Sequence, residues 1–269
     1  MTLKPLLAVL AVGLVFSEGC TTVETTKPGA VGVDRRQHML VSEAEVEKGA
    51  QEAYSQEVAK ARSAGKLNTD KALTARVRNV SQRLIPATGA FRPDAPKWEW
   101  EINTLETKDL NAYAMPGGKI MVYSGLVDQL KLSDAEMAAV IGHEIAHALR
   151  EHSRERISRA YAQQLALAGV AVVTGATQGT MDLANTVASV TFQLPHSREQ
   201  ESEADEIGME LMARAGYDPN AAVSVWKKML AANQGGPPEF LSTHPSPSSR
   251  IQDLQKLVPK VMPLYKPRN

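Results

Sequence analysis

The stretch His143-Glu144-Ile145-Ala146-His147 is the part of the sequence around which the fold is predicted. It is an instance of the pattern H-E-x-x-H. On a helix, residues four apart lie on one face, so the two imidazoles can reach one metal ion. Glu144 lies about 100° round the helix, where a general base can take a proton from a water at the metal. The stretch therefore predicts a zinc site with His143 and His147 as ligands and Glu144 as the base.

A capping box predicts where the helix that carries this stretch begins. Ser-Asp-Ala-Glu at 133–136 has the form S-x-x-E, and Asp134 suits the positive end of the helix dipole. No proline follows as far as about Ser158, and the only glycine is Gly142, so one uninterrupted helix is predicted. Ionisable side chains on a buried helix must be paired or bind a metal, the alternative being two histidines satisfied within the core. Burial is predicted because apolar residues cover nearly all sides: Ala138, Ala139, Val140, Ile141, Ile145, Ala146, Ala148 and Leu149.

A zinc site needs a third protein ligand, and the extended form H-E-x-x-H-x-x-G-x-x-H does not supply it. Arg150 stands in the place of its glycine and Ser153 in the place of its last histidine. His152 is one position short of that place and, on an uninterrupted helix, faces away from the two ligands, so it is interpreted as a surface histidine. A glutamate from a second helix is therefore expected.

The segment 195–206 is rich in carboxylates, and helix geometry selects among them. On a wheel of about 100° per residue, Glu201 and Asp205 share a face with small and apolar residues. Glu201 is therefore predicted to be the third zinc ligand, and Asp205 to accept the free ring N–H of a ligand histidine. The opposite side is predicted to be an ordinary solvated face, made of Glu199, Glu203, Glu206, Glu210 and Arg214.

These two motifs resemble a known family of enzymes. H-E-I-A-H followed by S-R-x-x-E-x-E-A-D at 197–205 is similar to the zinc metallopeptidases that include the CAAX prenyl proteases, HtpX and the Oma-type proteases. The segments 111–126 and 242–251 are also similar to that family, most of all to its periplasmic bacterial lipoprotein members. The resemblance implies His143, His147 and Glu201 as ligands of one zinc ion, Glu144 as base and Asp205 beside the ligands. It also implies an α+β, mainly helical, zincin-like (gluzincin) fold with a small antiparallel sheet beside the catalytic helix.

The N-terminus has the pattern of a secretion signal. Lys4 precedes an apolar run at 6–16 that is too short to span a bilayer, and small residues lead to Cys20, the only cysteine. A lone cysteine at this place resembles the lipidation site of a bacterial lipoprotein, although Ser17 and Glu18 depart from the usual signal. We expect residues 1–19 to be a signal peptide and Cys20 to carry the lipid that anchors the chain to a membrane on the periplasmic side, with the outer membrane preferred to the inner one. Ordinary signal-peptidase cleavage, giving a soluble periplasmic or secreted protein, is the alternative.

Composition restricts the remaining functions. Lys plus Arg and Asp plus Glu both number 30, so there is no case for binding nucleic acid or for electrostatic docking to a membrane. Residues 20–41 lack periodicity and contain Thr, Pro and Gly, which is typical of a tether, here a lipidated one. Residues 42–269 are expected to form the peptidase domain.

The rest of the pattern is mostly helical. Helices are predicted at 42–64, 71–84, 219–233 and 248–258, and a strand at 97–103. Segments 110–115 and 119–123 flank Pro-Gly-Gly and are predicted to form an antiparallel pair beside the catalytic helix, with an edge that could bind an extended substrate. Segment 164–194 is interpreted as a buried helical hairpin, or else as a gate hinged near Gly175 and Gly179.

The predicted function is a zinc-dependent endopeptidase of the bacterial cell envelope that acts on unfolded or misassembled envelope proteins. His244 lies in the family-like downstream segment and is a candidate either for an oxyanion donor or for a ligand that blocks the open zinc position. A loop histidine of structural importance only is the alternative role. The alternative functions are a chaperone-like binding module with a latent or structural zinc site, and a zinc reservoir.

Overall fold

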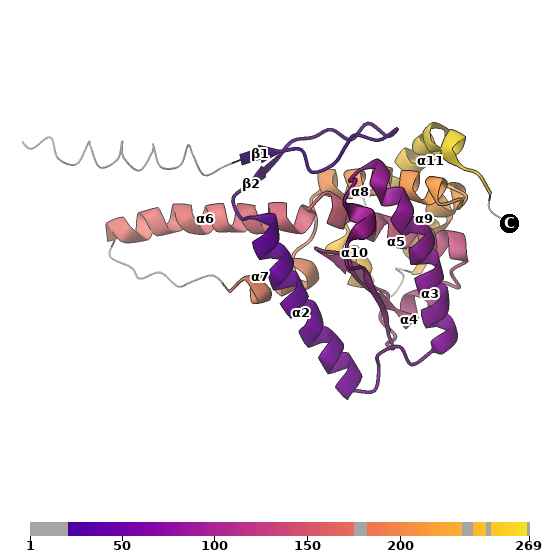
Figure 1. Cartoon of the computed structure of the whole chain (residues 1–269), viewed down its shortest axis with the longest axis horizontal. Coiled ribbons are helices and arrows are strands. Elements are labelled where there is room, and N and C mark those ends of the chain that lie inside the picture. Colours follow the sequence, from indigo (N-terminus) through magenta and orange to yellow (C-terminus); the bar gives the residue numbers. More distant parts are fainter. Residues whose placement is uncertain (1–20, 175–181, 233–238, 246–248, 268–269) are drawn as a thin grey trace, which may run out of the picture.

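A computed structural model describes residues 21–174, 182–232, 239–245 and 249–267 (Figure 1). The strands are β1 (Thr21–Val23), β2 (Gln37–Met39), β3 (Glu101–Leu105), β4 (Ala112–Met115) and β5 (Lys119–Tyr123). The longer helices are α2 (Glu43–Ser63), α3 (Lys71–Leu84), α5 (Asp134–Leu149), α6 (His152–Thr174), α7 (Leu183–Phe192), α8 (Arg198–Arg214), α9 (Asn220–Ala232) and α11 (Arg250–Val261). Short helices are α4 (Ser124–Gln129), α10 (Glu239–Thr243), η1 (Ile85–Ala90), η2 (Ala95–Lys97) and η3 (Met262–Leu264). The prediction of a mainly helical α+β fold is confirmed.

The helices α5 and α8 cross at the centre of the molecule, and two glycines let them approach. A Cβ atom on Gly142 would lie 3.0 Å from the carbonyl oxygen of Gly208, and one on Gly208 would lie 2.8 Å from the amide nitrogen of His143. Any larger residue at either place would push the helices apart. The glycine beside the first histidine therefore has a packing role, because it brings the side chains of the two motifs within reach of each other.

Capping boxes begin both of these helices, as the sequence of α5 predicted. Ser133 accepts from the amide of Glu136, whose carboxylate accepts from the amide of Ser133 in return. Ser197 and Gln200 make the same pair of bonds at the start of α8. Every residue of α5 from Glu136 to Leu149 is buried, which confirms the predicted burial of this helix.

The main sheet has the order β3-β5-β4, with β4 antiparallel and β3 parallel to β5. The predicted pair around Pro-Gly-Gly is confirmed, while the strand expected at 97–103 begins only at Glu101, because residues 95–97 form a 3₁₀ turn that contains Pro96. One face packs with α3 and α5 in the main core, and the other face packs with α2 and α7. Consequently β4 lies at the edge of the sheet, directly beside α5.

A sharp turn separates α5 from α6, where an uninterrupted helix as far as Ser158 was predicted. That prediction is wrong: α5 ends at Leu149, Glu151 has a left-handed φ of 51°, and α6 begins at His152. Neither glycine nor proline marks the turn in the sequence. Arg150 is fully buried at the corner and donates to Glu203 and to the carbonyl of Arg35, and these tertiary contacts stabilise the break.

Residues 21–41, expected to be a free tether, pack on the domain, and we call them the N-terminal strap. β1 and β2 pair within it, and Val31, Val33 and Met39 are buried. The amide of Val31 donates to Glu210 over 2.9 Å, and the Gln37 side chain donates to the carbonyl of Arg150 over 2.7 Å. The expectation of a loose segment was wrong because these partners lie far along the chain. The division of the chain into signal, anchor and domain stays a prediction, and residues 1–20 lie outside the described residues.

The segment 164–194, predicted to be a helical hairpin, contains the end of α6, which projects beyond α7 in Figure 1, and α7, which contacts α6 and α2. Val187 and Val190 of α7 are buried. Gly175 and Gly179, the hinge positions of the alternative interpretation, lie outside the described residues. The helices predicted at 42–64, 71–84, 219–233 and 248–258 are confirmed as α2, α3, α9 and α11. Within the described ranges, none of the helices combines the length and the hydropathy required to cross a membrane.

Candidate metal centre

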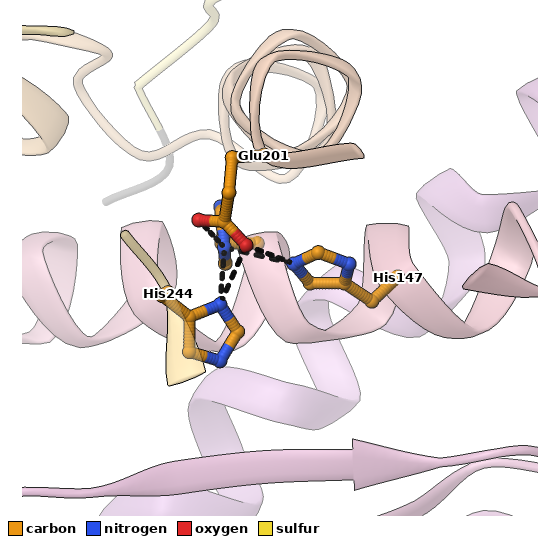
Figure 2. Close-up of side chains that lie close together, drawn as sticks. His147, Glu201 and His244 are labelled. Atoms are coloured by element: carbon orange, nitrogen blue, oxygen red, sulfur yellow. Dashed lines mark hydrogen bonds and ion pairs between the residues drawn. The ribbon is translucent and has the colours of Figure 1, made fainter. Parts of the chain in front are cut away.

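The side chains of α5 and α8 bring three potential metal ligands together. The Nε2 atoms of His143 and His147 lie 3.0 Å apart. The Glu201 carboxylate lies 3.5 Å from the first of these nitrogens and 3.3 Å from the second. All three residues are buried, and Figure 2 shows the carboxylate directed between the rings of His147 and His244. The residues predicted to be ligands from two separate motifs are thus neighbours in space.

The outer nitrogen of His143 has the partner that the helical wheel predicted. Its Nδ1 lies 3.0 Å from Asp205, one turn after Glu201 on α8. Arg250 of α11 donates to Asp205 over 2.6 Å and to Glu201 over 2.8 Å, and its guanidinium stacks on Trp226 at 3.4 Å. Sequence reasoning assigned no role to Arg250. Its only signal was its place at the end of the family-like segment.

The outer nitrogen of His147 bonds to His152, which corrects the interpretation of His152 as a surface residue. His152 is fully buried, and its Nδ1 lies 2.7 Å from Nδ1 of His147. Its Nε2 lies 2.9 Å from Glu203. The break after α5 turns His152 back toward His147, whereas an uninterrupted helix would have directed it away.

The predicted solvated face of α8 is also wrong in part, since Glu203 and Glu210 are buried. Glu203 accepts from Arg150 and from Arg35 of the N-terminal strap, and Glu210 accepts from the amide of Val31. The strap covers this face, so the carboxylates exchange water for guanidinium and amide donors. Two members match the prediction: Glu199, with a side chain 63% exposed, and Arg214, which is also exposed.

We expect His152→Phe to weaken zinc binding by about 10- to 100-fold, the usual effect of losing a partner of a ligand histidine. Phenylalanine fills the buried volume but cannot accept the N–H of His147, so this imidazole loses its fixed orientation. Asp205→Ala is expected to weaken zinc binding by a similar factor, because His143 loses the partner of its Nδ1. Competition with a chromogenic chelator measures the affinity, and a melting curve of the metal-free variant controls for folding. An unchanged affinity in a folded His152 variant would show that the contact does not orient the ligand.

Glu144, the predicted base, has one carboxylate oxygen without a hydrogen-bond partner among the described residues. Its Oε2 accepts from the amide of Ala114 on β4 over 3.3 Å, while its Oε1 is buried with no hydrogen-bond partner among the described residues. Burial raises the pKa of Glu144 above its ordinary value, although His244 and His143 oppose the shift. A carboxylate whose pKa is moved toward neutrality is suited to accept a proton and pass it on.

His244 joins the same cluster from the bend that directly follows the short helix α10. Its Nδ1 lies 2.9 Å from Glu201 and 3.3 Å from Nε2 of His143, and its Nε2 lies 3.5 Å from Glu144. The ring is buried and stacks on Phe240, with centroids 4.3 Å apart. His244 is therefore held within ligand distance of the other three donors.

The donor set fits a zinc ion. When Nδ1 of His143 donates to Asp205 and Nδ1 of His147 donates to His152, the Nε2 atom of each ring carries a lone pair. These two lone pairs face each other and the Glu201 carboxylate. A divalent cation stabilises such an arrangement, and tetrahedral bonds of about 2.0–2.1 Å would place donors about 3.3 Å apart. Burial lowers the pKa of His143, but Glu201 and Asp205 outweigh it and raise the pKa to about 9, and this negative potential also favours a metal cation. Burial keeps the pKa of His147 well below its ordinary value, so this ring is neutral and free to bind.

The ion pairs around Glu155, in the network that supports His152, should make the free energy of unfolding depend on pH in the acid range. Burial raises the pKa of Glu155, but bonds from Arg35, Gln200 and Gln37 outweigh it and lower the pKa from 4.5 to about 2. Because the folded pKa is the lower one, this stabilisation is present above about pH 4.5 and is lost as the pH falls toward about 2. We expect Arg35→Ala to remove most of an effect of about 3 kcal/mol. Urea unfolding between pH 7 and pH 3 measures it, and parallel pH profiles for the two proteins would contradict it.

The fold and the site together define a class of protein. A buried H-E-x-x-H helix, a glutamate from a second helix and a sheet edge beside the base are the parts of a zinc metallopeptidase, a hydrolase. Residues 71–258 match the profile of peptidase family M48, and the chain belongs to this family.

Curated relatives agree with this assignment. The chain is 32% identical to the mitochondrial metalloendopeptidase OMA1 of Saccharomyces cerevisiae over 72% of its own length and 58% of that protein. It is 41% identical to the mitochondrial metalloendopeptidase OMA1 of Arabidopsis thaliana, over 56% of this chain and 30% of the relative. It is 27% identical to the beta-barrel assembly-enhancing protease of Escherichia coli, over 76% and 42%. The chain thus spans between about a third and three fifths of the length of these relatives.

Proposed function

We propose that this chain is a zinc-dependent endopeptidase of the bacterial cell envelope that cleaves unfolded or misassembled envelope proteins. The observation that carries the proposal is the free acceptor of Glu144 beside three metal donors, because a purely structural site has no use for a base. The printed names of the relatives from Escherichia coli and Vibrio cholerae, beta-barrel assembly-enhancing protease and its putative counterpart, support the envelope as the place of action. The mitochondrial relatives support the peptidase chemistry.

The residues of the site divide the work of peptide hydrolysis. His143, His147 and Glu201 would hold zinc, which supplies Lewis-acid chemistry to the scissile carbonyl and to water. Glu144 takes the proton of the attacking water on its free Oε1 and delivers it to the leaving amine. Asp205 and His152 keep the two imidazoles in the tautomer that leaves Nε2 unprotonated.

The edge of the main sheet suits an extended substrate. Within the described ranges, β4 pairs with β5 on one side only, and its Ala114 amide already contacts the proposed base. A peptide added to the free side of β4 by backbone hydrogen bonds would pass beside Glu144. This arrangement selects for unfolded segments, because a folded substrate has no free strand to offer.

The decisive assay incubates the purified chain with an unfolded outer-membrane protein, with and without a chelator, and follows cleavage by gel and mass spectrometry. Cleavage that stops with chelation and returns with added zinc is the expected result. Suppressed aggregation without cleavage would instead support the chaperone-like alternative.

The proposed envelope location needs a separate experiment, because it depends on Cys20, which lies outside the residues that the structure describes. We infer that Cys20 is lipidated and holds the enzyme at a membrane facing the periplasm, with the outer membrane preferred. Stable anchoring needs more than one acyl chain. Mass spectrometry of the mature N-terminus checks the inference, and an unmodified Cys20 in a freely soluble protein would remove the anchor from the proposal.

We expect His244→Ala to raise the turnover of an unfolded substrate severalfold. The Nδ1 of His244 lies within 3.3 Å of both Glu201 and His143, which supports a role in which the ring blocks the open zinc position. If His244 instead donated to the oxyanion, His244→Ala would lower turnover, since loss of such a donor costs about 10²- to 10³-fold. Initial rates at equal zinc content separate the two roles, and a large fall in turnover would establish the donor role instead.

A further inference from the structure

A polar cleft lies beside the metal donors and contains most of the unsatisfied polar atoms of the described structure. It is lined by residues 111–114 at the sheet edge, by Glu144 and His147, by residues of α6 and α7, by His196 ahead of α8, and by Thr243 and His244. Six buried side-chain nitrogen or oxygen atoms in the described ranges have no hydrogen-bond partner. Four of these six line this one cleft: Glu144 Oε1, Arg156 Nε, Thr191 Oγ1 and His196 Nδ1. Native proteins pair nearly all such groups, so their concentration here indicates a polar ligand.

Arg156 is the unusual member of this group, because it is a buried arginine without a carboxylate. It is 8% exposed, and one of its nitrogens donates to the carbonyl of Leu194 over 2.6 Å. No carboxylate in the described part of the chain lies within 4.0 Å of its guanidinium. The two other most deeply buried arginines, Arg150 and Arg250, both have such partners, at 3.1 Å and 2.6 Å.

The charge of Arg156 persists at neutral pH in spite of its burial. Burial lowers its pKa to about 10, while the more distant Glu201 and Glu144 oppose the shift. The guanidinium is therefore cationic where the enzyme works, and zinc would offset the charge of Glu201. A buried cation is strongly stabilised by a carboxylate, and the planar fork of arginine matches the two carboxylate oxygens.

We propose that Arg156 forms a subsite that binds a carboxylate of the substrate peptide, with Thr191 and His196 supplying further hydrogen bonds. The inference deepens the proposed peptidase function and rests on it. It predicts that cleavage is favoured beside an acidic side chain or near a free C-terminus, since both present a carboxylate. The position of the cleft between the sheet edge and the base places this carboxylate within a few residues of the scissile bond.

The test uses the zinc-loaded chain and decapeptides of one neutral sequence in which a single Glu or Gln is moved from position to position. Each peptide is made with a free and with an amidated C-terminus. We expect kcat/KM to be about 10- to 100-fold higher for the carboxylate at one position, the usual worth of a charge-assisted bidentate bond. If the preference follows the internal Glu, the subsite reads a side chain; if it follows the free C-terminus, it reads the chain end.

Two variants of α6 connect the preference to Arg156. Arg156→Gln is expected to reduce the ratio of kcat/KM for acidic and neutral peptides to nearly one, and Arg156→Lys to leave an intermediate ratio. Arg159→Gln removes an equal charge from an exposed position on the same helix, 58% exposed, and should leave the ratio unchanged. A uniform fall in kcat/KM for all peptides in the Arg156 variants would mean that the residue only anchors Leu194, and would overturn the subsite.

A binding measurement separates this inference from the peptidase proposal. The same peptides are titrated into the zinc-loaded Glu144→Gln variant, and their dissociation constants are measured by fluorescence anisotropy. Tighter binding of the carboxylate peptides without cleavage by the wild type would keep the subsite and reject the peptidase. Equal binding and equal cleavage of acidic and neutral peptides by the wild type would reject the subsite while the peptidase stands.

Discussion

Glu144→Gln is expected to abolish peptide cleavage while the chain keeps its zinc. The substitution is nearly isosteric and leaves His143, His147 and Glu201 unchanged, but an amide cannot take a proton from water. Loss of a general base costs typically about 10²- to 10⁴-fold in rate. The amide can still accept from the backbone of Ala114, so the packing of β4 against α5 is preserved.

Two measurements on the same sample check this prediction. Metal analysis should give equal zinc contents for the variant and the wild type, and initial rates on an unfolded substrate should differ by the factor above. Near wild-type turnover in the variant would mean that another group takes the proton. His244 would be the first candidate, since its ring lies 3.5 Å from Glu144.

Glu201→Ala is expected to remove both the metal and the activity. Its carboxylate is 2% exposed and lies within 3.5 Å of both Nε2 atoms, and alanine offers no ligand atom in its place. Zinc affinity should fall by more than about 100-fold, because loss of a mere hydrogen-bond partner of a ligand already costs about 10- to 100-fold. Chelator competition measures the affinity, and full zinc content at equal affinity would exclude Glu201 as a ligand.

Glu199→Ala is the matched control for this experiment. Glu199 lies in the same first turn of α8, but its side chain is 63% exposed, and its shortest distance to Arg35, 3.6 Å, is too long for a hydrogen bond. Its removal should change neither zinc content nor turnover. Glu203, which helix periodicity alone would have offered as the control, is unsuitable because Arg150, Arg35 and His152 would all lose a buried partner.

The family comparison and the core geometry agree with what short-range patterns predicted. The capping box at Ser133, the apolar surround of α5 and the Pro-Gly-Gly turn each depend on neighbours within a few residues. The wheel also placed Glu201 and Asp205 on the buried face of α8, where both now contact His143. Their roles as ligand and as partner of a ligand stay predictions until metal is measured.

The sequence by itself determined the parts whose information is local: where helices begin, which strands pair across a tight turn, and which side chains of one helix share a face. Tertiary structure alone decided the surroundings of the donors. Arg35 of the N-terminal strap donates to Glu203, and Arg250 of α11 donates to Asp205. Because α5 ends at Leu149, His152 lies against His147. Periodicity describes one element at a time, whereas the energy of a buried charge depends on partners that any distant part of the chain can supply.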